Sequence, residues 1–452
     1  MKGTNRPTII LLTFVLAVST IFCLLLSSSS IAYANSPDNW PMFHHDIGHT
    51  GYSTSSQTPI QDTLLWNYTT NSVVGASPAI VNGHLYIGSD AGVAYCINAL
   101  DGSEIWNFSV PINSQIVHGV ESIAISSSMA VASGKVYFGC YDRNIYCLNA
   151  ATGAELWNFT TGNTVESCPS IINGYLYVGS WDGNVYCINA ADGTKIWSFK
   201  TGGLVESSPA IANGYVFAGS ADGKVYCFDA SSGAEIWSYT TGNIVESSPT
   251  VIDDRVYIGS DDDNVYCLNA TNGNKIWNYP TQSWVTSTPA VANGYVYVGT
   301  GESGSANPDK NIYCLNAVTG AKIWNFATRD GVDSSPAVAW DLVYIGGWDG
   351  SVYCLNASSG ANIWTYATGN HVSSSPAVWN GIVYVGSWDH HVYAFGYPLT
   401  TSTPSPGTQP LLSVTAEIVY IVAFVIVVAA IVASVIAVRH KKYSRSHKQA
   451  TQ

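Results

Sequence analysis

Positive charge is scarce in this sequence. Only 10% of its 452 residues are charged, and 30 acidic residues stand against 17 basic ones. Seven of the basic residues lie before Asn35 or after Val438, so the part between carries 10 basic against 30 acidic residues, a formal charge of −20. Such a surface repels the phosphates of nucleic acids and anionic lipids, so we expect no nucleic-acid partner. Cations, basic proteins and neutral glycans remain as partners.

Familiar catalytic and metal-binding motifs are also absent. The sequence has no phosphate-binding glycine loop, no His-x-x-x-His zinc pattern and no Cys-x-x-Cys pair. No Ser, His and Asp stand in the order of a known hydrolase. We therefore predict no catalytic residues and no metal ligands. Two short runs, His44-His45-Asp46 and His390-His391, are either metal donors or solvated loop residues, and the sequence leaves both open.

A repeat of about 40 residues is what the sequence does contain. Tryptophans recur at spacings of 40, 51, 40, 40, 40, 47 and 40 residues, which is typical of a propeller or a solenoid. Each unit holds four short runs rich in Val, Tyr and Ile, separated by Asn-Gly or Asp-Gly turns, and this pattern predicts two tight hairpins. The repeated tryptophans are Trp66, Trp106, Trp157, Trp197, Trp237, Trp277, Trp324 and Trp364.

The ends of the array indicate how it closes. The first tryptophan strand precedes any complete unit, and the last unit ends at residues 391–396 without one. We therefore predict that residues 63–69 supply the outer strand of the last blade, which removes the open edge. The fold class is all-β, an eight-bladed β-propeller with four-stranded blades over residues 63–397.

One cysteine recurs at the same place on the third strand of seven blades, and Ala394 takes that place in the eighth. Equivalent positions in neighbouring blades are too far apart for a disulfide, so we expect small, buried, hydrophobic side chains. Cys140 and Cys168 lie outside this register, and whether they pair is left open. The repeated residues are Cys96, Cys147, Cys187, Cys227, Cys267, Cys314 and Cys354.

Glycines such as Gly153, Gly193 and Gly233 can dock the tryptophans. This arrangement resembles the PQQ-like (BamB-like) β-propeller repeats of the quinoprotein alcohol dehydrogenase-like superfamily. The run "NWPMFHHDIGHTGY" is similar to the lead-in of many such proteins. For the enzymes, the resemblance implies pyrroloquinoline quinone (PQQ) over the central channel, with calcium and a disulfide between adjacent cysteines. This sequence has no adjacent cysteine pair, and no catalytic carboxylate can be matched. We expect no cofactor, with PQQ or Ca²⁺ as the alternative.

The two ends of the chain predict export and anchoring. A basic start, an apolar run and Ala32-Tyr33-Ala34 indicate a signal peptide over residues 1–34, followed by a lead-in over 35–62. Residues 398–417 are a Pro/Ser/Thr-rich stalk, and 418–438 are 21 uncharged residues, enough for a transmembrane helix. The basic tail, residues 439–452, then places the propeller outside a cell membrane crossed once. The sequon asparagines, which fit a glycoprotein, are Asn67, Asn107, Asn158, Asn269 and Asn356.

Strand direction locates the predicted working face. The upper end of the ring, where the innermost strands begin, gathers acidic residues at one repeat position and tryptophans in nearby turns. We expect this face to bind a cation, a surface protein or a glycan, so that the protein is a non-enzymatic scaffold; the alternative is a PQQ-dependent oxidoreductase. The predicted site residues are Glu166, Glu206, Glu246, Asp333, Trp181, Trp348 and Trp388.

Overall fold

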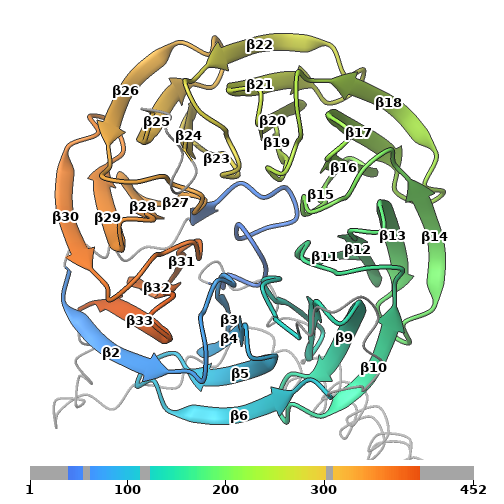
Figure 1. The fold of residues 1–452 in the computed structure, drawn as a ribbon, viewed down its shortest axis with the longest axis vertical. Helices are drawn as coiled ribbons and strands as arrows, with labels where there is room; N and C mark the ends of the chain where they lie inside the picture. The colour runs from blue at the N-terminus through green and yellow to red at the C-terminus, as the bar shows by residue number, and fades with distance from the viewer. Residues whose placement is uncertain (1–38, 54–61, 112–122, 302–308, 398–452) are drawn as a thin grey trace, which may run out of the picture. The chain divides into compact units, whose positions relative to one another are not determined.

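Eight antiparallel blades of four strands each stand around a central axis in the computed structural model (Figure 1), and residues 52–53 add a fifth, parallel strand to one of these sheets. The structure describes residues 39–53, 62–111, 123–301 and 309–397. In seven blades the four strands follow one another along the chain from the axis outward. The predicted all-β, eight-bladed propeller is therefore confirmed.

The strands fall into four concentric sets. The innermost strands have three residues each: β3 (Ala79–Val81), β7 (Ala130–Ala132), β11 (Ser170–Ile172), β15 (Ala210–Ala212), β19 (Thr250–Ile252), β23 (Ala290–Ala292), β27 (Ala337–Ala339) and β31 (Ala377–Trp379). The second strands are β4 (His84–Ser89), β8 (Lys135–Gly139), β12 (Tyr175–Gly179), β16 (Tyr215–Ser220), β20 (Arg255–Ser260), β24 (Tyr295–Gly299), β28 (Leu342–Gly346) and β32 (Ile382–Gly386).

The third strands are β5 (Val93–Asn98), β9 (Asn144–Asn149), β13 (Asn184–Asn189), β17 (Lys224–Asp229), β21 (Asn264–Asn269), β25 (Asn311–Asn316), β29 (Ser351–Asn356) and β33 (His391–Gly396). The outer strands are β6 (Glu104–Ser109), β10 (Glu155–Thr160), β14 (Lys195–Lys200), β18 (Glu235–Thr240), β22 (Lys275–Pro280), β26 (Lys322–Ala327), β30 (Asn362–Ala367) and β2 (Leu64–Thr69). The middle residues of the third strands are all buried because neighbouring blades cover both their faces, whereas outer strands alternate between exposed and more buried residues.

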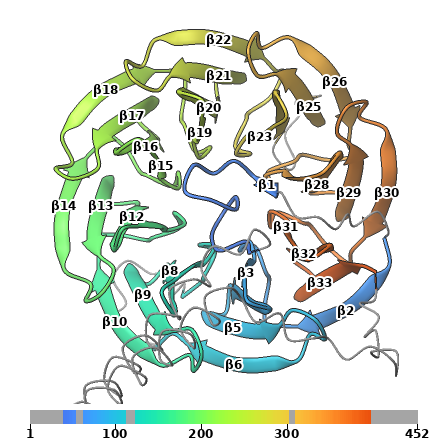
Figure 2. The same cartoon turned by 180° about the vertical axis from the view of Figure 1, so that it is seen from behind.

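The ring closes between the two ends of the array, as predicted. Strand β2 pairs in antiparallel register with β33, from Leu64 opposite Phe395 to Thr69 opposite His391. Figure 2 shows the same junction from behind, where the first outer strand completes the last blade. No blade is therefore left with an unpaired third strand.

The repeated tryptophans dock neighbouring blades, also as predicted. Each of the first seven indoles covers a glycine of the next blade so closely that a Cβ on Gly153, Gly193 or Gly233 would lie within 2.6–2.8 Å of ring atoms. The indole N–H donates to an alanine carbonyl beside that glycine, as from Trp197 to Ala230 at 3.0 Å. Trp364 differs, because its nitrogen has no partner within the described residues.

The cysteines are packing residues. All nine cysteines in the described ranges are buried and free, including Cys140 and Cys168, whose pairing the sequence left open. The seven register cysteines lie opposite the docking tryptophans on the outer strands, as Cys187 lies opposite Trp197. Cys140 and Cys168 each stand where most other blades carry serine, at positions such as Ser180 and Ser208.

A closed ring of hydrogen bonds joins residues that lie two positions before the innermost strands. In every blade one backbone N–H donates to a side chain of the next blade, at 2.9–3.2 Å, and the last blade donates to the first. Seven acceptors are hydroxyls and one is the thiol of Cys168. In order, the residues are Ser77, Ser128, Cys168, Ser208, Ser248, Thr288, Ser335 and Ser375.

The lead-in is not a separate element, because residues 39–53 pass through the centre of the ring (Figure 1). This segment ends in β1 (Tyr52–Ser53), which pairs in parallel with β27. The predicted signal peptide, stalk, transmembrane helix and basic tail lie outside the described residues. Within the ranges that are described, no helix is long and apolar enough to span a membrane.

The indole–glycine contact is testable with a matched pair of glycines. Gly233 and Gly214 both have positive φ, +71° and +80°, but a Cβ on Gly233 would lie 2.6 Å from the Trp197 ring, whereas Gly214 has nothing within 4 Å. We expect Gly214→Ala to cost about 1 kcal/mol of unfolding free energy and Gly233→Ala roughly 3 kcal/mol or more, measured by denaturant unfolding. Equal losses would contradict the docking role of the tryptophan.

Candidate functional site

One repeat position lies four residues before each innermost strand, at the upper end of the ring. We call the residues at these eight places the rim positions. Four carry acids and four carry small or hydroxyl residues, so the repeat itself does not demand a carboxylate there. Departures from the repeat are therefore the informative residues. The rim positions are Gly75, Ser126, Glu166, Glu206, Glu246, Thr286, Asp333 and Ser373.

Three of the predicted acids act on one another. Burial is the main cause that raises the pKa of Glu206 to about 8, and the negative charges of Glu166, Glu246 and Asp261 raise it further. Burial also raises the pKa of Glu166, where Glu246 and Asp90 add repulsion and the Tyr141 hydroxyl, at 3.0 Å, offsets part of it. The ring of blades thus brings three carboxylates of successive blades together at one end of the axis.

Two further acids join this group from the turns between second and third strands. Burial raises the pKa of Asp90, which accepts a hydrogen bond from Ser126 at 3.3 Å. Asp261 is only 6% exposed and adds to the repulsion at Glu206. The sequence analysis missed both, although they occupy the same turn position as Trp181, Trp348 and Trp388 and alignment of the repeats would have found them.

Asp333 has a different environment from the three glutamates. Its carboxylate accepts hydrogen bonds from the indole N–H of Trp348 and from Thr286. Two of the predicted tryptophans thus lie beside rim positions, because the indole N–H of Trp388 donates to Ser373 at 2.8 Å. The third, Trp181, lies near Tyr141, with ring centroids 5.8 Å apart.

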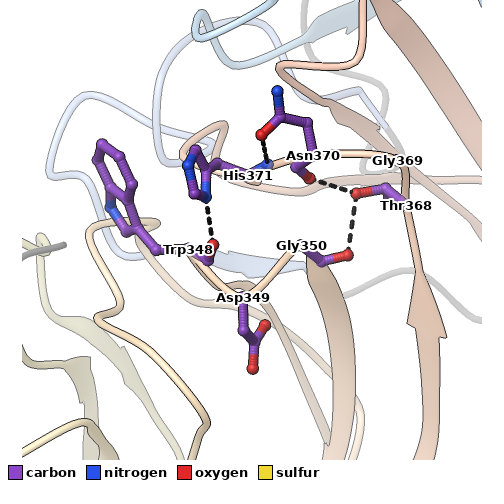
Figure 3. A pocket seen from close by; sticks show the side chains of 7 residues that line it. All are labelled: Trp348, Asp349, Gly350, Thr368, Gly369, Asn370 and His371. Atoms are coloured by element: carbon purple, nitrogen blue, oxygen red, sulfur yellow. Dashed lines mark hydrogen bonds between the residues drawn. The ribbon is translucent and has the colours of Figure 1, made fainter. Parts of the chain in front are cut away.

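Trp348, Trp388 and His371 form an aromatic cluster over the last two blades. The ring centroids lie 4.7 Å apart for Trp348 and His371, 5.4 Å for His371 and Trp388, and 5.1 Å for the two tryptophans. His371 Nδ1 contacts the carbonyl of Trp348, which holds the imidazole beside the indole (Figure 3). His371 had no signal in the sequence beyond standing where other blades carry Thr164, Leu204 or Ile244.

A pocket of ≈ 170 Å³ opens beside this cluster (Figure 3). Most of its wall belongs to the repeat and has a structural role: Asp349 accepts the hydroxyl of Tyr353, and Thr368 donates to the carbonyl of Gly350 at 2.9 Å. The residues specific to this pocket are therefore Trp348 and His371. Its lining consists of Trp348, Asp349, Gly350, Thr368, Gly369, Asn370 and His371.

The histidine runs do not behave as solvated loops throughout. His44 is 2% exposed and lies in the centre of the ring, so of the two alternatives the solvated loop does not apply to this residue. His391 contacts Asp389 at 3.3 Å near the surface. Among the residues that the structure describes, no three His, Cys, Asp or Glu side chains are grouped as metal ligands.

The fold and the indole–glycine contacts define an eight-bladed propeller of PQQ-like repeats. The sequence profile of the family described as "Outer membrane protein assembly factor BamB" matches residues 56–120, 117–243, 221–307 and 308–397. The chain therefore belongs to this family, and the resemblance inferred from its sequence is confirmed.

Similar curated proteins include enzymes and assembly factors. A quinohemoprotein alcohol dehydrogenase from Comamonas testosteroni is 31% identical over 134 residues, which are 28% of this chain and 19% of the enzyme. The assembly factor BamB from Salmonella typhimurium is 28% identical over 112 residues, 24% of this chain and 28% of that protein. The matches thus span less than a third of either relative.

Solved structures show the same division. A europium-containing methanol dehydrogenase superposes with a TM-score of 0.69 and 15% identity, over 82% of this chain and 100% of the other. BamB from Moraxella catarrhalis superposes with a TM-score of 0.61 and 19% identity, over 74% and 97%. At such identities the likeness concerns the fold alone.

The residues at the upper end fit PQQ poorly. PQQ is a planar tricarboxylate, and a site for it needs cationic or N–H donors around its carboxylates. The rim positions instead carry Glu166, Glu206, Glu246 and Asp333, without a lysine or arginine. The described cysteines are all free and none is adjacent to another, so no ring of neighbouring cysteines is present there.

The crowding of carboxylates gives a pH dependence that can be measured. The pKa of Glu206 is raised from 4.5 to about 8, so the native state keeps a proton that the unfolded chain loses, and stability falls as the pH rises through this window. We expect Glu206→Gln to raise the melting temperature at pH 8.5 by roughly 2–5 °C and to change it little at pH 4. Glu235→Gln, on an exposed outer strand, is the control; an equal effect there would contradict the account.

Proposed function

We propose that this protein is a non-enzymatic binding module that captures cationic groups of a partner at the upper end of its ring. Residues 418–438 anchor it in the cell membrane, with the propeller outside. The observation that carries the proposal is the convergence of Glu166, Glu206 and Glu246. Burial and the repulsion between these carboxylates raise the pKa values of Glu166 and Glu206. Binding of a positive charge at such a site is favourable, because the charge relieves the repulsion between the carboxylates.

The aromatic cluster supports a partner with organic character. Tryptophan faces attract the ammonium and guanidinium groups of lysine and arginine and also pack against apolar or sugar rings. Trp348 and Trp388 are both held by hydrogen bonds from their indole N–H to rim residues, which orients their rings. Asp333 places one carboxylate beside this cluster, because it accepts the indole N–H of Trp348. A protein partner with several exposed lysine or arginine side chains would use both the cluster and the three glutamates, whereas a neutral glycan would use the aromatic rings alone.

The test is binding of a fluorescent lysine-rich peptide by the full chain in detergent, followed by anisotropy. We expect Glu166→Gln/Glu206→Gln/Glu246→Gln to weaken binding at least tenfold and to flatten its dependence on salt, because the attraction is coulombic. The matched control is Glu104→Gln/Glu155→Gln/Glu235→Gln, which removes three exposed carboxylates from outer strands and leaves the rim positions intact. Calorimetry with calcium on the same two triple variants measures calcium binding separately from peptide binding.

Two results would overturn the proposal. Equal loss in the rim and control variants would reduce the attraction to net charge. Binding of a neutral oligosaccharide, lost in Trp348→Ala but not in the rim triple variant, would identify a glycan partner in place of a cationic one.

The alternative is a PQQ-dependent oxidoreductase, which the similarity to quinoprotein alcohol dehydrogenases favours. The acidic rim positions argue against it. We expect no dye-linked alcohol oxidation by the full chain after incubation with PQQ and calcium, and no absorbance change from bound quinone. Turnover that depends on the added quinone would replace the scaffold proposal with the enzymatic one.

A further inference from the structure

Residues 39–53, which we call the hub segment, run through the centre of the ring. Figure 1 shows this stretch in blue at the centre, and Figure 2 shows it there from behind. Its backbone hydrogen bonds reach the blades in the order in which these follow along the chain, starting with Trp40 on the first blade and ending with β1 on the seventh.

Backbone hydrogen bonds hold the hub segment to six blades. In each of these blades the middle residue of the innermost strand donates its N–H to a hub carbonyl, at 2.6–2.9 Å. The blades thus bind the hub through the same backbone N–H group in each case, and a backbone N–H is present in every residue except proline. The donor and acceptor pairs are Ile80 to Trp40, Val131 to Pro41, Ile211 to Ile47, Val251 to Gly48, Val291 to Thr50 and Val338 to Gly51.

The ring needs such a partner. Within its own blade an innermost strand has a neighbouring strand on one side only, so the N–H of its middle residue faces the axis. A buried N–H without a partner costs about 1–3 kcal/mol. The inner edges of the blades therefore form a circular array of donors suited to a peptide main chain.

Side chains make the fit specific. Trp40 and His49 are 2% and 0% exposed. His49 Nε2 contacts Ser170 Oγ at 3.0 Å and so reaches the third blade, which is not among the six that donate a backbone N–H. Two glycines allow close approach, because a Cβ on Gly48 would lie 2.7 Å from the carbonyl oxygen of Val251 and one on Gly51 would lie 2.9 Å from the Cβ of Ala290.

The hub backbone has a shape that a free peptide would rarely adopt. His44, His45 and His49 have φ values of +54°, +78° and +56°, in the left-handed region that non-glycine residues occupy rarely. Within the segment, Asp46 accepts the N–H groups of Gly48 and Thr50, at 3.0 and 3.1 Å. The contacts with six blades therefore stabilise a conformation that the segment does not prefer alone.

We propose that the centre of the ring is a peptide-binding site and that residues 39–53 are its built-in ligand, recognised by main-chain donors of six blades and by the fit of Trp40, Gly48, His49 and Gly51. The strand pairing that closes the ring joins β2 to β33, and no hub residue takes part in it. A peptide of the same sequence can then take the place of the segment.

Acid weakens this binding. Burial lowers the pKa of His44 to about 4 and that of His49 to about 3, and the titratable groups that act on either histidine, His45 and Asp46, also belong to the hub. Both histidines are neutral in the bound segment and take up protons at about pH 6.5 once released. Release is therefore favoured as the pH falls below 6.5.

The test cuts the full chain between the hub and β2, at a protease site inserted within residues 54–61. After cleavage at pH 7.5, the N-terminal fragment should co-elute with the ring in size-exclusion chromatography. A fluorescent peptide of residues 35–53 should then exchange into the ring, faster at pH 5 than at pH 7.5.

Two peptides control the exchange. The Gly51→Ala peptide should bind at least tenfold more weakly, because it combines a φ of +65° with the contact to Ala290. The Tyr52→Phe peptide, changed at a half-buried position, should exchange like the original. Loss of the fragment with an unchanged melting temperature, unfolding of the ring on cleavage, or equal binding of the Gly51→Ala peptide would each overturn the proposal.

Discussion

The circle of hydrogen bonds from each blade's backbone N–H to a hydroxyl or thiol of the next blade sets the spacing of everything near the axis. Eight such bonds leave no gap, since Ser375 donates to Ser77 across the junction at 2.9 Å. The rim position lies two residues before the ring residue, as Glu166 precedes Cys168. Carboxylates of successive blades are therefore held close by a backbone circle that does not depend on their charge. This is why repulsion between them persists in the native state instead of being relaxed by movement.

Burial shifts pKa values in opposite directions at the upper end and at the centre of the ring. At Glu206 burial and like charges favour the protonated form, whereas at His49 burial favours the neutral form. Lowering the pH below 8 therefore relieves the repulsion among the carboxylates, whereas lowering it below 6.5 weakens the binding of the hub segment to the ring. At Glu206 the neighbouring charges are carboxylates that add to the effect of burial, and at His49 the attraction of Asp46 offsets only part of it.

Repetition is useful for separating structural residues from functional ones. Seven of the eight upper turns carry, at the position of Asp182, an aspartate that the sequence alone would place among exposed acids, yet Asp182 accepts the hydroxyl of Tyr186 at 2.6 Å and the N–H of Gly162 at 2.7 Å, and other blades repeat the arrangement. Such residues shape the turn. Glu206, Trp348 and His371 have no such repeated role, and they are the residues to which we assign the proposed binding at the upper end.

The sequence alone determined the ring, its eight blades, the closing strand and the docking of Trp197 on Gly233, because each follows from a local pattern copied many times. It also indicated the carboxylates of Glu166, Glu206 and Glu246, since their place in the repeat is readable. The tertiary structure decided what meets at the axis: Asp90 and Asp261 beside the glutamates, His371 between two tryptophans, and the hub segment bound by six blades. These contacts join residues up to 287 positions apart, as between Gly51 and Val338. At least one partner in each contact is a residue that occurs once and not in every repeat. A pattern that occurs once gives no period to read, so only the folded chain shows which partners it meets.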